Sequence, residues 1–132
     1  MSKKCENLVY PDISYKLLGL AYSVHNKLGG GLREKTYENA MELAFKDEGI
    51  KYKRQANLPI KYADAKVGDR FVDFLIEDRI VLELKSGDRF GKNNLNQVNE
   101  YLKTNKLKLG IILNFGLEKV YSKRVVNICW PN

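Results

Sequence analysis

The stretch Phe71-Val-Asp-Phe-Leu-Ile-Glu-Asp-Arg-Ile-Val-Leu-Glu-Leu-Lys-Ser86 carries most of the information about this fold. Apolar runs at 70–77 and 80–86 are rich in branched and aromatic residues and flank Asp78-Arg79. This pattern predicts two strands joined as a β-hairpin. Both runs also contain charged side chains where apolar ones are expected, and the positions of these charges indicate what the hairpin does.

Three charged side chains interrupt the two apolar runs. Asp73 lies in the first run, and Glu83 and Lys85 lie two residues apart in the second. Because side chains alternate between the faces of a strand, Glu83 and Lys85 share one face. Burying charge in a sheet is costly unless the charge is paired or bound to a metal. Two acids here share one lysine, so a divalent cation would balance the surplus negative charge.

The register of the hairpin decides whether Asp73 joins that face. A two-residue loop at Asp78-Arg79 would pair positions whose numbers have an odd sum, and Asp73 would then share a face with Leu84, away from Glu83. Asp73 and Glu83 lie on the same face only if the residue numbers of paired positions have an even sum. We therefore expect an odd-length loop or a bulge between the two strands.

Apolar residues with helical spacing precede the hairpin. A first helix is expected to run to residue 28, with Asp12 as its N-cap and Gly29-Gly30-Gly31 at its end. A second helix is expected over 33–48, with Gly49 closing it. His25 lies within the first helical pattern, and we expect it to be structural.

The remaining segments complete an α/β pattern. Residues 50–62 are expected to be extended and 64–69 to form a turn. A short helix is expected around 95–102, followed by strands at 107–115 and 119–128. The order helix, helix, three strands, helix, two strands predicts an α/β sandwich around a mixed central sheet.

Composition places the chain among globular proteins. Its 132 residues are 44% hydrophobic and 30% charged, which predicts one domain over 1–132. No stretch approaches the roughly 20 apolar residues of a membrane span, and the first residues lack the apolar core of a signal peptide. We therefore expect a cytoplasmic protein with no membrane partner. Two distant cysteines, Cys5 and Cys129, argue against a zinc site and leave any chemistry to carboxylates and lysine.

The charge balance favours a polyanionic partner. Lysine and arginine number 23 against 16 acids, a net charge of +7. The simpler explanation is a solvated, lysine-rich surface. The candidates for contact with nucleic acid are Arg54, Arg89, Lys92, Lys103 and Lys106.

The charged positions also resemble a known pattern. Asp73 followed by Glu83-Leu-Lys85 resembles the signature of PD-(D/E)XK nucleases, with Val72 where that pattern often has proline. Gly31-Leu-Arg-Glu-Lys-Thr-Tyr37 resembles the motif of the GxxExxY proteins, a branch of that superfamily. The resemblance continues in further blocks: Gln55, Leu58–Tyr62, Gln97–Leu102, Leu109–Gly116 and Lys123–Val125. It covers nearly the whole chain and implies a restriction-endonuclease-like fold.

The resemblance implies a metal site on the hairpin. Asp73 and Glu83 would be direct ligands of Mg²⁺ or Mn²⁺, with the backbone carbonyl of Leu84 as a third oxygen donor. Lys85 would hold or help to deprotonate the attacking water and screen charge in the transition state.

Residues on two helices would complete that site. Glu34 would act through a metal-bound water, Gln97 would orient the water or a phosphate, and Tyr101 would share the face of Gln97. Simpler explanations exist for each. An acid such as Glu34 stabilises a helix N-terminus, Gln97 and Tyr101 have the spacing of a surface pair, and Tyr37 has the position of a core residue.

Three functions remain open at this point. The first is a metal-dependent nuclease, for which we expect DNA rather than RNA as the substrate; a structure-selective junction or flap endonuclease is one form of it. The second is a catalytically silent nucleic-acid-binding or accessory module of the same fold. The third is a basic protein-interaction domain that binds no divalent metal. Cleavage of both strands would favour a homodimer, with Trp130 or Tyr121 at its interface.

Overall fold

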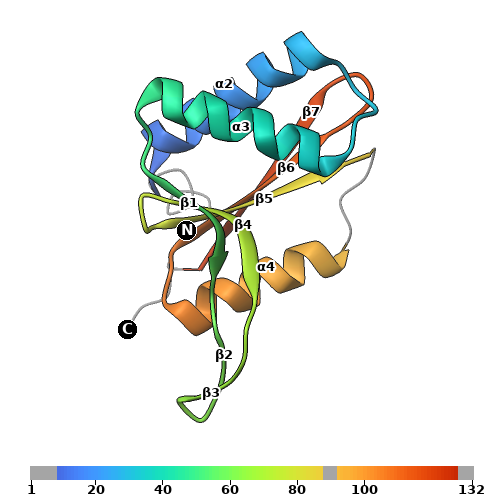
Figure 1. Ribbon diagram of the computed structural model, residues 1–132. Helices are drawn as coiled ribbons and strands as arrows, with labels where there is room; N and C mark the ends of the chain where they lie inside the picture. Colours follow the sequence, from blue (N-terminus) through green and yellow to red (C-terminus); the bar gives the residue numbers. More distant parts are fainter. Residues whose placement is uncertain (1–8, 88–91, 128–132) are drawn as a thin grey trace.

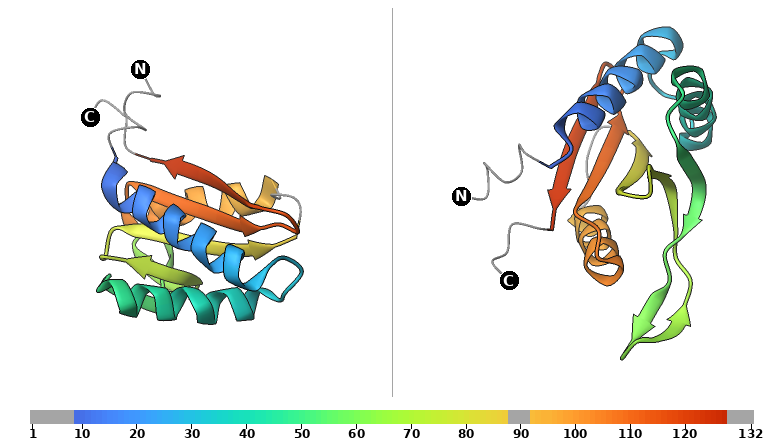
Figure 2. Two further views of the ribbon diagram at one scale, coloured as in Figure 1. Left: turned by 90° about the horizontal axis from the view of Figure 1, so that it is seen from above. Right: turned by 90° about the vertical axis from the view of Figure 1, so that its left-hand side faces the viewer.

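The computed structural model describes residues 9–87 and 92–127. Its elements, in chain order, are α2 (Pro11–Leu28), α3 (Glu34–Glu48), β1 (Tyr52–Asn57), β2 (Ile60–Tyr62), β3 (Ala65–Gly68), β4 (Phe71–Ile76), β5 (Ile80–Ser86), α4 (Lys92–Asn105), β6 (Leu109–Phe115) and β7 (Val120–Val126). Five strands form a mixed sheet in the order β1-β4-β5-β6-β7, with α2 and α3 over one face and α4 over the other (Figures 1 and 2). The predicted α/β sandwich is confirmed.

The strands β5 and β6 form the centre of the sheet. They are parallel and are connected through α4, while the other neighbouring pairs are antiparallel. Every residue of β6 is buried, because helices cover both of its faces. None of the helices in the described ranges is long and apolar enough to cross a membrane.

Each face of the sheet has its own hydrophobic core. Under α2 and α3, aromatic rings pack closely: Tyr37 stacks on Phe115 with ring centroids 4.3 Å apart, and Phe45 meets Phe74 edge-on at 5.0 Å. The smaller core lies under α4 and includes Leu102. Both cores hold the central strands rigidly, so side chains at the strand ends have defined positions.

The hairpin between β4 and β5 has a three-residue loop. Ile76 pairs with Ile80, so paired positions have an even sum and the loop is Glu77-Asp78-Arg79. Glu77 and Asp78 take positive φ angles of 53° and 57°. Lys51 and Lys53 approach the Asp78 carboxylate at 3.1 and 3.0 Å. The expected odd-length loop is confirmed.

The segment expected to be a turn at 64–69 contains a strand instead. Ala65–Gly68 pairs with Ile60–Tyr62 to form a separate two-stranded sheet, with positive φ angles at Ala63 and Asp64 in the tight turn. This arm continues β1 and β4 beyond the central sheet and projects past α4 (Figures 1 and 2). Sequence alternation did not reveal it, because both of its strands lack a buried face.

The first helix begins two residues earlier than expected. Pro11 occupies the first helical turn, where its missing N–H is not needed, and Tyr10 precedes it in a left-handed conformation (φ 48°). Asp12 therefore lies in the first turn rather than at the N-cap, and its charge favours the helix N-terminus there. The Arg79 guanidinium lies 4.3 Å from the centroid of the Tyr10 ring.

The glycine loop after α2 is held from two sides. The Tyr37 hydroxyl donates to the Gly29 carbonyl at 2.6 Å and accepts from the Leu32 N–H at 3.3 Å. Gly30 packs directly on the backbone of Leu117, leaving no room for a Cβ atom. His25 Nε2 bonds the carbonyl of the residue before Leu117 at 2.8 Å, consistent with its expected structural role.

Gly30→Ala is expected to lower the free energy of unfolding by about 1–3 kcal/mol. The added Cβ would lie 2.2 Å from the Leu117 carbonyl oxygen, a clash that only backbone movement relieves. Gly19→Ala is the matched control, since a Cβ there meets nothing within 4 Å and alanine favours a helix interior. Urea denaturation of both variants measures the difference. Equal midpoints would contradict the close packing at Gly30.

Candidate active site

The side chains of β4 change from one face of the sheet to the other at Asp73. Phe74 and Ile76 pack in the core under α2 and α3, whereas Val72, at the same strand parity, packs in the core under α4. Opposite Asp73 on β1, Gln55 has a φ of 50°, which interrupts the regular strand conformation. From this point β1 and β4 leave the sheet together and continue into the arm.

Where β4 separates from β5, backbone N–H groups lose their partners in the sheet. The carboxylates of Asp73 and Glu83 accept hydrogen bonds from them. Regular pairing of β4 with β5 ends at Phe74 and Leu82. Beyond it, the Asp73 N–H donates to Glu83 Oε2 at 2.8 Å, and the Leu84 N–H donates to Asp73 Oδ2 at 2.7 Å. Each carboxylate thus bonds a donor on the opposite strand that would otherwise be unpaired. The expected juxtaposition of Asp73 and Glu83 is present.

These carboxylates lie in an environment that disfavours their charge. Burial, followed by the charge of Asp73, raises the pKa of Glu83 to about 7, although Lys85 opposes the shift. Burial also raises the pKa of Asp73, and the charge of Glu38 adds to this. The pair therefore carries excess negative charge that either a proton or a cation would compensate.

A side-chain relay connects Asp73 to α3. Gln55 Nε2 donates to Asp73 Oδ1 at 3.3 Å and to Glu38 Oε2 at 2.9 Å. Glu38 is buried and also accepts from Arg54 Nε at 2.7 Å. Sequence reasoning missed Glu38, although it lies one helical turn after Glu34 and so follows it along the same side of α3. Glu34 itself is exposed, and its charge contributes to the raised pKa of Glu83.

The Arg54 side chain is largely buried against α3, whereas a phosphate contact is expected to face solvent. Its three guanidinium nitrogens bond Glu38, Glu42 and Asn39, each at 2.7 Å. These partners all lie on α3, so Arg54 attaches β1 to that helix. These bonds use one N–H of each guanidinium nitrogen, and the contact of Arg54 with nucleic acid stays a prediction.

The ends of β5 and β6 hold the glycine loop beside the carboxylates. Ser86 Oγ donates to the Leu32 carbonyl at 2.6 Å. Lys85 is half-buried and lies beside Asn114 in the parallel register. The Asn114 amide donates to the Gly87 carbonyl, while its buried Oδ1 has no partner among the described residues. The loop that precedes Glu34 is thus attached to the strand that carries Glu83 and Lys85.

The predicted residues of α4 lie in a separate groove. Gln97 and Tyr101 line a hollow of about 310 Å³ between α4 and the base of the arm, and the Arg70 guanidinium lies 5.3 Å from the Tyr101 ring centroid. Within the described ranges, neither residue bonds to the carboxylates. Lys103 and Lys106 are exposed. Arg89 and the side chain of Lys92 lie outside the described residues, as do both cysteines and Trp130.

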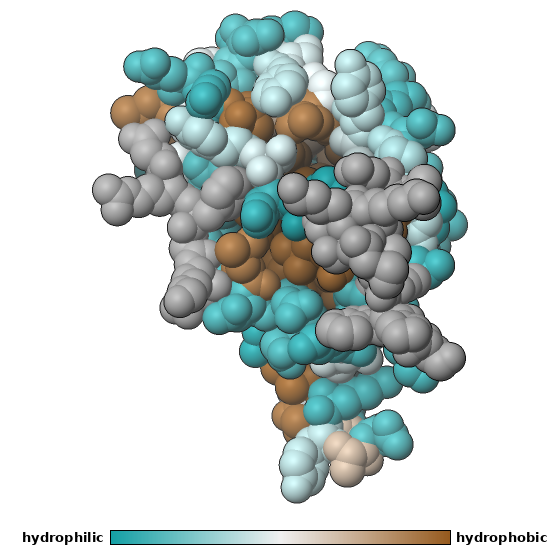
Figure 3. Space-filling model, turned by 180° about the vertical axis from the view of Figure 1, so that it is seen from behind, coloured by the Kyte–Doolittle hydropathy of each residue, from teal (hydrophilic) through white to brown (hydrophobic). Residues whose placement is uncertain are grey.

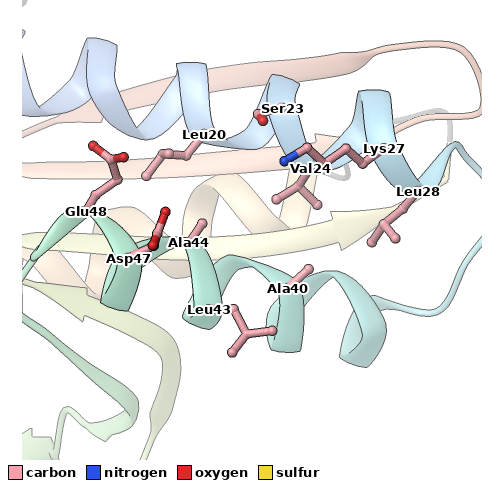
Figure 4. Close-up of a pocket in the computed structure, with 10 residues that line it drawn as sticks. All are labelled: Leu20, Ser23, Val24, Lys27, Leu28, Ala40, Leu43, Ala44, Asp47 and Glu48. Atoms are coloured by element: carbon pink, nitrogen blue, oxygen red, sulfur yellow. The ribbon is translucent and has the colours of Figure 1, made fainter.

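A larger hollow of about 680 Å³ lies away from this chemistry, between α2 and α3. Leu20, Val24 and Leu43 are among the apolar side chains that line it (Figure 4). It contains neither of the paired carboxylates, so its size does not make it the candidate active site.

The donors around Asp73 and Glu83 fit a hard divalent cation. The N–H and C=O of an extended residue point to the same edge of its strand, so the Leu84 carbonyl faces the gap left by β4. Two carboxylates and a carbonyl are the oxygen ligands that Mg²⁺ and Mn²⁺ prefer. In residues 9–87 and 92–127, no group of three or more His, Cys, Asp or Glu side chains is placed to bind a metal. A cation here would therefore retain several waters.

Comparison with known families agrees with this geometry. A family model described as the PD-(D/E)XK nuclease superfamily matches residues 11–125. This chain belongs to that superfamily. The PD-(D/E)XK match includes both carboxylates, Lys85, α4 and the glycine loop. Membership supports a nuclease-like function for the domain and a hydrolase acting on phosphodiester bonds.

A solved structure shares the PD-(D/E)XK fold of this chain. The crystal structure of SSO0001 superimposes with a TM-score of 0.55 at 16% sequence identity. The match covers 70% of this chain and 49% of SSO0001, so the present chain spans about half the length of that protein. At this identity the likeness concerns the fold alone. The search of curated proteins gives no match.

The raised pKa of Glu83 predicts an unusual pH dependence of stability. Between the ordinary value of 4.5 and about 7, the folded protein binds more protons than the unfolded chain. The metal-free protein is therefore expected to lose up to about 3 kcal/mol of stability from this residue as pH rises through that window. Urea denaturation in EDTA at pH 5 and pH 8 measures the loss.

Glu83→Gln is the matched control for this measurement. Its amide oxygen still accepts from the Asp73 N–H but does not titrate. Subtracting its profile from that of the wild type removes the contributions of other acids. Parallel profiles for the two proteins would show that Glu83 is not held in a charge-disfavouring environment.

Proposed function

We propose that this protein is a nuclease dependent on Mg²⁺ or Mn²⁺ that hydrolyses phosphodiester bonds, with DNA rather than RNA as its substrate. The observation that carries the proposal is the pairing of Asp73 and Glu83 in the gap between β4 and β5, with Lys85 two residues further on. Membership of the PD-(D/E)XK superfamily and the net charge of +7 support it.

The chain's own groups have distinct tasks in this proposal. Asp73, Glu83 and the Leu84 carbonyl would hold the cation, which when bound would activate water and screen the phosphate charge. Lys85, on the same face as Glu83, would hold the attacking water and stabilise negative charge at the scissile phosphate. Gln55 would keep the Asp73 carboxylate oriented through its hydrogen bond.

Two helices would supply outer contacts. Glu34 would bond a water of the cation, since its charge already acts on Glu83 across the gap. Gln97 and Tyr101 would contact the substrate from the groove beside α4. In-line attack of the water would then break the bond to the leaving oxygen, with the water proton passing to solvent.

We further place the chain in the GxxExxY branch. The motif has a physical rationale here: Tyr37 bonds both sides of the glycine loop, and that loop is attached to β5 through Leu32 and Ser86. The motif residues thus support the carboxylates and position Glu34 at the start of α3.

The wider partners are also proposals. Arg89, Lys92, Lys103 and Lys106 would contact the nucleic-acid backbone, and a single site suits cleavage of one strand at a junction or flap. Cleavage of both strands of a duplex would require a second copy, and the exposed Tyr121 is a candidate for that contact.

Metal binding is expected to depend on Glu83. Titration of Mn²⁺ and Mg²⁺ into the wild type should release or absorb heat and raise the melting temperature, because the cation removes the repulsion between two partly buried carboxylates. Glu83→Gln should abolish both effects, while Glu118→Gln, which removes an exposed acid, should retain them. Absence of binding in the wild type, with DNA also present, would favour the catalytically silent module.

Cleavage is expected to need both Asp73 and Lys85. Asp73→Asn and Lys85→Ala should each reduce cleavage of labelled DNA at least 100-fold, because one loses a ligand charge and the other the cation beside the scissile phosphate. Asparagine is preferred to alanine at Asp73, since its oxygen can still accept from the Leu84 N–H. Lys46→Ala, on the exposed side of α3, is the control. Undiminished cleavage by either site variant would refute the assignment.

A further inference from the structure

The groove between the arm and α4 has no role in holding the cation, yet it is built from chemically varied side chains. Pro59, Ile60 and Lys61 line it from the base of the arm, and Arg70 lines it where the arm returns to the sheet. The helix α4 contributes the opposite wall (Figures 1 and 2). In Figure 3 the arm forms the narrow lower end of the molecule, with hydrophilic and hydrophobic surface side by side.

Among the described residues, neither cation of this groove forms an ion pair, although Glu100 also lines it. Lys61 is exposed and has no ion pair within the described part of the chain, in contrast to Lys66, whose ammonium lies 2.7 Å from Asp69. The Arg70 guanidinium lies over the Tyr101 ring rather than beside a carboxylate. Both groups are therefore available to bind phosphate oxygens.

The opposite wall carries groups that recognise nucleobases. Asn96, Gln97 and Asn105 bring side-chain amides to the groove, and amides donate to and accept from base edges. Tyr101 is buried and lies beneath the planar Arg70 guanidinium, whose outer face provides a surface for stacking. One acid, Glu100, also lines this wall. The charge of Glu100 would repel phosphates, so the phosphate backbone of a bound strand would run along the arm and not along α4.

The groove is close to the paired carboxylates. Arg70 directly precedes β4 and lies three residues before Asp73, a distance of about 10 Å at the usual rise of extended chain. A polynucleotide bound along the arm wall therefore reaches the gap between β4 and β5 without a large bend.

We propose that this groove binds an unpaired nucleic-acid strand, with phosphates on Lys61 and Arg70 and a base between the arm and α4. The proposal rests on the proposed nuclease function and specifies its substrate as a duplex that carries a single-stranded branch. Unpaired bases expose both their faces and their pairing edges, which amides and stacking surfaces recognise, whereas paired bases in a duplex do not. A groove of about 310 Å³ has the size of a small-ligand site and takes a base rather than a helix.

Binding can be tested separately from cleavage in the full-length Asp73→Asn protein. Fluorescence anisotropy would compare a blunt DNA duplex, the same duplex with a single-stranded flap, and the same flap made abasic. We expect the flapped duplex to bind at least tenfold more tightly than the blunt one, and the abasic flap to lose most of this gain.

Substitutions in the groove are expected to remove the preference. Lys61→Ala and Arg70→Gln should each weaken flap binding at least fivefold and reduce its salt dependence by about 0.7 in the logarithmic slope per lost phosphate contact. Binding of the blunt duplex should be unchanged. Lys46→Ala removes the same charge on the far side of the sheet and should have no effect. Lys61 is exposed, so Lys61→Ala reports binding even where Arg70→Gln perturbs packing on Tyr101.

Equal affinity for blunt and flapped duplexes, or equal effects of Lys61→Ala and Lys46→Ala, would overturn the proposal. Cleavage of flapped DNA by the wild type that is insensitive to both groove substitutions would overturn the groove and leave the nuclease function intact. Flap-selective binding through Lys61 and Arg70 without cleavage would support the groove and count against the nuclease.

Discussion

Two hydrogen bonds between β4 and β5, from the Asp73 N–H to the Glu83 carboxylate and from the Leu84 N–H to the Asp73 carboxylate, are the interaction on which the candidate site depends. Where β4 turns away from β5, two N–H groups lose their ladder partners, and the carboxylates of Asp73 and Glu83 accept from them. This arrangement places two carboxylates side by side in a partly buried setting; burial raises the pKa of both, and the charge of Asp73 raises that of Glu83 further. The same bonds that complete the sheet therefore create a site that favours a cation.

The rest of the molecule holds this junction in place. From the α3 side, Gln55 and Glu38 restrain the free oxygen of Asp73, and Arg54 fastens the helix to β1. From the other end, Tyr37 closes the glycine loop, and Ser86 attaches that loop to β5. Hydrogen bonds between distant segments thus limit the movement of the carboxylates, and preorganised groups are the more effective ones in catalysis.

The turn of β4 also connects the site with the arm. Because β1 and β4 leave the sheet together at Gln55 and Asp73, the ribbon that they form extends past α4 and encloses a groove with it. A single irregularity in the sheet therefore brings the two carboxylates together and, a few residues away, forms the groove that we propose binds substrate. Chemistry and recognition would be coupled through one pair of strands.

Much of the site could be predicted from local sequence. Charged residues within apolar strands revealed Asp73, Glu83 and Lys85, because alternation of side chains fixes which of them share a face. The requirement that Asp73 join them also predicted the odd-length hairpin loop, which the pairing of Ile76 with Ile80 confirms. Helical spacing of apolar residues likewise located α2 and α3. These are properties of neighbouring residues, and a short chain segment determines them.

Only the tertiary structure decided where β4 leaves the sheet and what its departure brings together. The arm has no buried face, so no hydrophobic pattern marks it, and the relay from Glu38 through Gln55 joins residues that are distant in sequence. Arg54 likewise could not be assigned from its charge, because its three acceptors become neighbours only when β1 packs beside α3. Sequence alone thus determined the chemistry of the two carboxylates and the lysine, since that depends on residue type and strand period. The partners of these groups depend on long-range contacts, which exist only in the folded chain.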